Sequence, residues 1–207
     1  MTILEAHREF KFRLDKMDAL NYPNFLPEEI DLVLNNAQER FIKQRYGVNN
    51  IKRQSFEEKK KRTEDLKNVT INAVLTPLAY ASDNIDLNAR FLTLPTNHWF
   101  TVQERCSITC TICGSPTTNL VEVIPISHSE FSKVIKDPFK QPTDTKVLRL
   151  MEAGRVELIS SCTIVDYRMR YIMQPPTVSI TTGVTFILSE HTHSEIIDQA
   201  VSIALEG

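Results

Sequence analysis

The residues best suited to bind a metal in this sequence are its four cysteines, Cys106, Cys110, Cys113 and Cys162. Structural zinc sites usually present two Cys-x2-Cys pairs, whereas here Cys110 and Cys113 form a single pair with that spacing. On a strand, Cys106 and Cys110 would share one face with other small core residues. We therefore expect core packing, and a zinc-stabilised module or small metal-assisted enzyme is the alternative. We also expect reduced thiols, because acidic residues occupy the N-terminal stretch where a signal peptide would be apolar.

Two histidines, His191 and His193, form a His-x-His pattern that could bind a metal from one face of a strand. They flank Thr192, where a capping-box pattern over Thr192–Glu195 predicts the start of a helix, so we interpret them as structural. The sequence contains no Gly-x-Ser-x-Gly, Gly-x-x-x-x-Gly-Lys or Gly-x-Gly-x-x-Gly pattern, and it has five glycines in all. We predict no catalytic residue, no cofactor and no enzyme activity.

A basic run, Lys59–Arg62, is the main candidate for a contact with nucleic acid. A capping-box pattern at Ser55–Glu58 predicts that the run lies on a helix ending near Asn68, where flanking acidic residues can pair with it at helical spacing. The whole chain has 24 Lys and Arg against 26 Asp and Glu, a net charge of -2. It lacks the cationic excess that drives binding to phosphates. We favour a solvated helix face, and a nucleic-acid-binding accessory protein is the second alternative.

Apolar periodicity predicts the helices that would position these residues. The first extends over Ile3–Met17. The second begins at Pro27, which suits a first helical position, and is followed by Gly47, which can supply a left-handed cap. The last helix follows Thr192 and has an apolar stripe up to Leu205.

The middle of the chain is rich in β-branched residues and predicts strands. A hairpin is expected at Gly114, between strands at Trp99–Ile112 and Asn119–Ile126. Val156–Ile159 and Cys162–Tyr171 are predicted to form another antiparallel pair around Ser160 and Ser161. Shorter strands are expected at residues 70–77 and 91–94. Residues 127–146 are predicted to form a long exposed loop with one helical turn near residues 130–135.

These elements predict an α+β fold with N-terminal helices, a central antiparallel β region and a C-terminal helix that packs back on the first helices. We expect a single structural unit over residues 1–207, with a helical part at 1–69, a mainly β part at 70–188 and a C-terminal helix at 189–207. The chain has 207 residues, of which 42% are hydrophobic and 24% charged, which excludes collagen-like and wholly disordered proteins. No apolar run approaches the length of about 20 residues that a membrane helix needs.

The order of segments is more informative than any single motif. It begins with a helix at Leu26–Ile42 whose first turn is acidic, and a helix of mixed charge follows. A group of strands then ends at Tyr171–Pro176, and the last segment is Ser189–Val201. This order resembles the virion ring proteins that are stacked below the portal in crAss-like, short-tailed bacteriophages. The closing helix also resembles the end of head–tail connector proteins more widely.

The resemblance implies a non-enzymatic subunit of a homo-oligomeric ring, in twelve copies to match a portal. Its partners would be further copies of itself, the portal protein and neighbouring tail ring proteins. It would reside in the tail region of the virion, after assembly in the host cytoplasm. Double-stranded DNA would pass through the lumen without being read, and a near-neutral chain suits a channel that must not hold phosphates.

Rings form through heterologous contacts, in which one patch of a subunit meets a different patch of the next copy. We select the 127–146 loop, an aromatic cluster and the N-terminal helix as candidates for these contacts. The residues that we expect at the interface are Phe91, Trp99, Phe100, Phe139 and Pro142.

Overall fold

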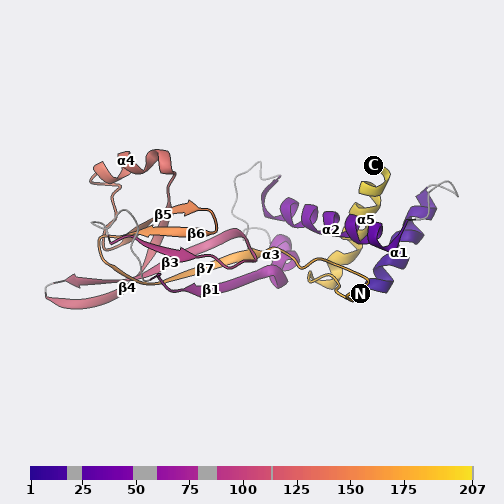
Figure 1. Cartoon of the computed structure of the whole chain (residues 1–207), viewed down its shortest axis with the longest axis horizontal. Helices are drawn as coiled ribbons and strands as arrows, with labels where there is room; N and C mark the ends of the chain where they lie inside the picture. The colour runs from indigo at the N-terminus through magenta and orange to yellow at the C-terminus, as the bar shows by residue number, and fades with distance from the viewer. Residues whose placement is uncertain (18–24, 49–59, 79–87, 113, 207) are drawn as a thin grey trace. The chain divides into compact units, whose positions relative to one another are not determined.

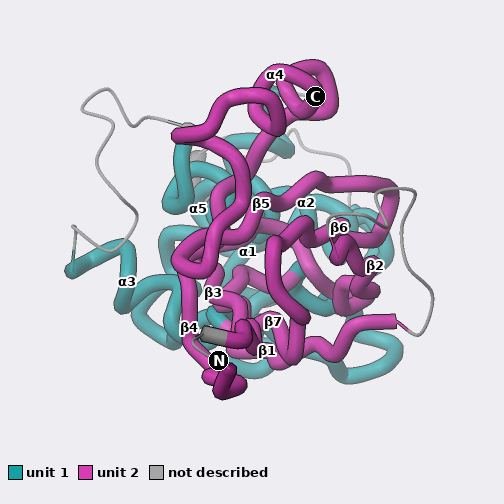
Figure 2. Tube along the Cα trace, turned by 90° about the vertical axis from the view of Figure 1, so that its left-hand side faces the viewer, with its two compact units in different colours: residues 1–70, 174–207 teal, residues 71–173 magenta. Residues whose placement is uncertain are grey.

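The computed structural model describes residues 1–17, 25–48, 60–78, 88–112 and 114–206. The chain divides into two compact units, residues 1–70 with 174–207 and residues 71–173 (Figure 2). We call them the helical unit and the β unit. The predicted fold class is confirmed, because helices come first, a mostly antiparallel sheet follows and a helix ends the chain. That the whole chain forms one structural unit stays a prediction.

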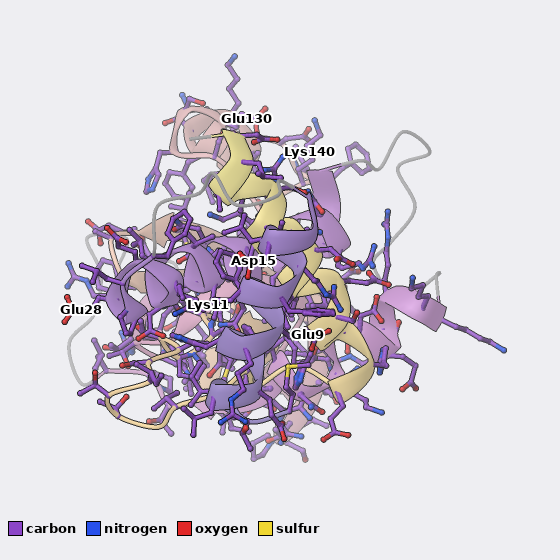
Figure 3. All side chains as sticks on the ribbon, turned by 90° about the vertical axis from the view of Figure 1, so that its right-hand side faces the viewer. Glu9, Lys11, Asp15, Glu28, Glu130 and Lys140 are labelled. Atoms are coloured by element: carbon purple, nitrogen blue, oxygen red, sulfur yellow. A yellow bond between two sulfur atoms is a disulfide. The ribbon has the colours of Figure 1, made fainter. Side chains whose placement is uncertain are left out.

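Three helices make up most of the helical unit (Figure 1). They are α1 (Ile3–Met17), α2 (Pro27–Lys43) and α5 (Glu190–Glu206). Helix α5 packs against both α1 and α2, as predicted. The buried stripes include Phe10 on α1, Phe41 on α2 and Ile197 on α5, all fully buried. Figure 3 shows the charged side chains of Glu9, Lys11 and Asp15 along α1, outside this core.

The ends of two helices differ from the prediction. Gly47 does not form a left-handed cap, because α2 continues into a π-helical segment, η1 (Gln44–Val48), that contains it. The capping box at Thr192 is also wrong, since α5 begins two residues earlier and the Thr192 hydroxyl donates to the carbonyl of Ser189 at 2.7 Å. The capping box predicted at Ser55 lies outside the described residues.

The segment that returns from the β unit is held against α2 by polar side chains of that helix. The Asn35 amide accepts a hydrogen bond from the N–H of Val178 at 2.7 Å and donates to its carbonyl at 2.9 Å. Asp31 accepts the N–H of Ile180 at 3.0 Å and contacts the buried His7 ring at 2.7 Å. These bonds satisfy the backbone of a segment that has no regular secondary structure.

The helical unit is completed by α3 (Lys60–Leu66) and a 3₁₀ turn, η3 (Lys67–Val69). The β unit is built on a seven-stranded sheet with the order β1-β7-β3-β4-β5-β6-β2. The strands are β1 (Thr70–Leu75), β2 (Arg90–Thr93), β3 (His98–Ile112), β4 (Ser115–Pro125), β5 (Lys146–Glu152), β6 (Arg155–Ile159) and β7 (Thr163–Met173). The hairpin at Gly114 is confirmed, and Gly114 has a φ of 83°, which favours glycine.

The predicted pairing of Val156–Ile159 with Cys162–Tyr171 is wrong. Strand β6 pairs with β5 and β2, whereas β7 pairs with β3 and adjoins β1. The sequence reasoning missed β5, which follows the loop directly and forms a hairpin with β6 through Gly154, at a φ of 71°. Strand β5 also runs parallel to β4.

The core of the β unit is a cluster in which side chains from β2, β3, β4, β5, β6 and β7 are buried together. A second cluster lies on the other face of β5 and β6. Helix α4 (His128–Lys136) covers this face with Phe131, Val134 and Ile135, which pack against a cluster containing Leu148 and Ile159 (Figure 1). Residues 127–146 are therefore more helical than the single turn predicted.

Candidate subunit interface

Among the described residues of the β unit, Phe139 is the most exposed large apolar side chain, with an exposed fraction of 88%. It lies in the turn between α4 and β5, and the turn is well ordered by hydrogen bonds. The Asp137 carboxylate accepts the N–H of Phe139 at 3.0 Å, and the Asp137 carbonyl accepts the N–H groups of Lys140 at 3.0 Å and Gln141 at 2.9 Å. The Lys146 ammonium donates to the carbonyl of Phe139. The backbone therefore holds the ring largely in solvent, as far as the described residues of the β unit extend.

Pro142, in the same turn, is buried. The exposed part of the turn is formed by residues 138–141. Of the two residues that we selected in this loop, Phe139 is thus exposed and Pro142 is buried.

The predicted aromatic cluster is divided between two strands. Trp99 and Phe100 stack in β3 with ring centroids 4.8 Å apart. Consecutive strand residues normally point to opposite faces, but the pairing of β3 with β7 shifts in register between His98 and Phe100. Phe91 lies in β2, where the Arg155 guanidinium is 5.1 Å from its ring centroid. All three aromatic side chains are half-buried.

Trp99 lines a surface hollow of about 710 Å³. One wall is the β2–β3 connection, with Leu94 and Pro95, and the other is the end of β5, with Met151 and Glu152, and the turn that follows it. The N–H of Leu94 donates to the carbonyl of Gly154 at 3.1 Å and joins the two walls.

Most of the lining of this hollow is uncharged at neutral pH. Burial lowers the pKa of His98, which also lines the hollow and bonds to the Thr101 hydroxyl at 2.9 Å. Glu152 brings a carboxylate to the rim and pairs with Arg155 at 3.5 Å. The hollow can accept an apolar side chain that arrives beside a positive charge.

A second hollow, of about 550 Å³, lies where β3 and β4 separate beyond the pair Arg105 and Glu122. Glu104 lines it and forms an ion pair with the Arg149 guanidinium at 3.1 Å. Burial raises the pKa of Glu104, although the nearby Arg149 opposes that shift. The charges of this buried pair compensate each other within the unit.

The predicted reduced state of the cysteines is wrong for two of them. Cys110 and Cys162 form a disulfide with a Cα–Cα distance of 5.0 Å. Cys106 is buried, as predicted, and burial raises the pKa of its thiol to about 12. Cys106 is therefore a protonated thiol within the core, and the disulfide occupies two of the other sulfurs. Cys113 lies outside the described residues.

His191 and His193, which we considered as possible metal ligands, each contact an oxygen atom of the protein. His191 lies 2.9 Å from the carboxylate of Asp65, and His193 bonds to the carbonyl of Leu188 at 2.9 Å. Among the described residues, no group of three His, Cys, Asp or Glu side chains is arranged to hold a metal ion.

The described part of the basic run is involved in ion pairs of the helical unit. Lys61 pairs with Glu195 of α5 at 3.1 Å, and Glu195 also pairs with Arg45. Asp65, which is buried, pairs with Arg45 at 2.8 Å. The structure therefore gives Lys61 a contact with α5 that the sequence reasoning did not anticipate. Lys59 and the acidic residues before it lie outside the described residues.

A family model described as phage tail ring protein 3/4 matches residues 1–206. The chain belongs to this family of crAss-like phage tail ring proteins. Two proteins of Bacteroides phage crAss001 are similar to it. Ring protein 3 is 27% identical over 208 residues, which cover 88% of this chain and 86% of that protein. Ring protein 4/5 is 24% identical over 227 residues, which cover 99% of this chain and 92% of that protein.

Because it belongs to this family, the ring protein is a structural component of a phage tail. The family also implies contacts with further copies of the chain and with neighbouring ring proteins. Within the described residues, no helix combines the length and apolar character needed to cross a membrane. The predicted family, the role as a tail ring protein and the location in the phage tail are thus confirmed.

Proposed function

We propose that the chain forms a homo-oligomeric ring below the portal of a short-tailed phage, and that double-stranded DNA passes through the lumen of this ring. The observation that carries the proposal is the match of a tail ring family to almost the entire chain, residues 1–206. The net charge of -2 supports passage without retention, because a strongly cationic lumen would bind the phosphates of the DNA.

We further propose twelve copies in the ring, so that its symmetry matches that of the portal above it. Closed rings need two different patches on each subunit. We place these patches in part at the Phe139 turn and at the hollow beside Trp99, with Phe91, Phe100 and Pro142 as supporting residues. The exposure of Phe139 and the volume of the hollow support this assignment.

Electron cryomicroscopy of the phage particle tests these proposals. The expected result is a ring of this chain on the tail axis, with twelvefold symmetry and with density for DNA inside the lumen of filled particles. A ring with another number of subunits would overturn the copy number alone. A position away from the axis, or a lumen too narrow for duplex DNA in every particle state, would overturn the channel function.

A further inference from the structure

The Phe139 turn and the Trp99 hollow are suited to each other but lie at opposite ends of one strand. Phe139 lies beside Lys146, the first residue of β5, because the Lys146 ammonium donates to the Phe139 carbonyl. The hollow contains Met151 and Glu152, the last residues of β5. Seven residues of extended chain span roughly 20 Å, so the Phe139 ring does not reach the hollow of its own subunit.

We propose that Phe139 of one copy inserts into the hollow of the next copy, and that this contact propagates around the ring. The occupant is a second copy of this chain, and the assignment rests on the proposed self-assembly of the ring. A knob at one end of β5 and a hollow at the other make the contact heterologous, as ring closure requires.

The two surfaces are also complementary in chemistry. The turn presents an apolar ring between Lys136 and Lys140, both exposed, and Figure 3 shows the Lys140 side chain at the surface. The hollow presents Leu94, Pro95, Trp99 and Met151 with the Glu152 carboxylate at the rim. Insertion would bury Phe139 against apolar side chains and bring a lysine near Glu152.

The order of the Phe139 turn favours this insertion. Its backbone is already fixed by the hydrogen bonds to Asp137 and Lys146, so binding orders few additional groups. An anchor residue that is rigid before binding is typical of the residues that contribute most to an interface.

Cysteine cross-linking in the full chain tests the pairing directly. The double variant Phe139→Cys/Met151→Cys is incorporated into phage tails and oxidised, and the products are separated without reductant. A heterologous contact predicts a ladder of covalent multimers, because each copy then carries both halves of the bond. The single variants should give no ladder, and the control pair Phe139→Cys/Leu120→Cys, with Leu120 exposed on β4, should give none either.

The variant Phe139→Ala provides a second measurement. It should weaken subunit association at least about tenfold in light scattering, whereas Leu32→Ala, which removes an exposed apolar side chain from α2, should not. Rings that form normally from Phe139→Ala, together with no ladder from the double variant in tails, would overturn the pairing and leave the ring function intact. A ladder that joins this chain to another tail protein would assign the hollow to that neighbour and also overturn the pairing.

If the unsubstituted chain is absent from rings in phage tails, the proposed function itself fails, which is a different result from loss of this contact.

Discussion

Single polar side chains determine how the helical unit closes. Asn35 supplies both a donor and an acceptor to the backbone of Val178, and Asp31 accepts the N–H of Ile180. Sequence reasoning placed Asn35 on α2 correctly but gave it no role. Its partner lies 143 residues further along the chain, and no local pattern shows such a contact.

We expect Asn35→Ala to destabilise the protein by about 1–3 kcal/mol, because it leaves two partly buried backbone groups without partners. The matched control is Asn36→Ala, an exposed neighbour on the same helix that has the same change in helix propensity. Its effect should stay within about 0.5 kcal/mol. Urea unfolding followed by circular dichroism measures both, and equal effects would contradict the assigned role of Asn35.

His193 predicts a dependence of stability on pH. Burial lowers its pKa below the ordinary value of 6.5, and the ring bonds to the Leu188 carbonyl. The unfolded chain therefore binds a proton more readily than the folded chain does. The stability that His193 contributes is present above pH 6.5 and is lost as the pH falls through the lowered pKa of the folded state.

The variant His193→Gln keeps a side-chain donor and cannot acquire this charge, so its unfolding midpoint in urea should fall less than that of the native chain as the medium becomes more acidic. His128→Gln, which removes an exposed imidazole from α4, controls for the loss of one histidine. Parallel pH profiles for the native chain and His193→Gln would exclude this role.

At the scale of the elements, the disulfide is the feature with the largest expected effect. It joins β3 to the residue directly before β7 and closes a loop with a sequence separation of 52. A loop of this length corresponds to roughly 4 kcal/mol of stabilisation in the chain-entropy model.

A reductant should therefore lower the unfolding midpoint of the native chain in urea, and the double variant Cys110→Ala/Cys162→Ala should show no such response. Peptide mapping by mass spectrometry without reductant should recover the peptides containing Cys110 and Cys162 as one linked species. Recovery of these peptides as separate species would show that the bond does not form.

Local sequence predicted the elements better than their pairing. The bounds of α1, the start of α2 and the β3–β4 hairpin follow from periodicity, Pro27 and Gly114, which act over a few residues. The sequence reasoning failed where a strand pairs with a different neighbour from the one that the local turn signal indicates. Strand β6 pairs with β5 across a tight turn at Gly154, and the Ser160–Ser161 turn signal led to the wrong neighbour.

The sequence indicated the exposure of one candidate interface residue, and the interface itself stays a prediction. The exposure of Phe139 followed from its position between prolines and charged residues in a long loop. The burial of Pro142 and the hollow beside Trp99 could not be predicted, because both depend on strands that are adjacent only in the folded sheet.

For the molecule as a whole, the charge balance predicts weak binding to duplex DNA. The chain has a net charge of -2, and Lys61 of the basic run pairs with Glu195. We expect Lys60→Gln/Lys61→Gln/Arg62→Gln to leave the affinity for a DNA duplex unchanged within about twofold.

Fluorescence anisotropy with a labelled duplex at several salt concentrations measures this affinity. The control is the unsubstituted chain under the same conditions. Tight binding that weakens steeply with salt and is abolished in the triple variant would favour the nucleic-acid-binding alternative over passive passage.

The helical unit is formed by both ends of the chain, whereas the β unit is one uninterrupted stretch between them, which begins in β1 and ends in β7. During translation the ribosome releases residues 71–173 before it has made α5, the partner of α1 and α2. The sheet can thus fold while the helical unit still lacks α5. A nascent subunit therefore completes its helical unit last, when the Phe139 turn and the Trp99 hollow of the β unit have already been translated.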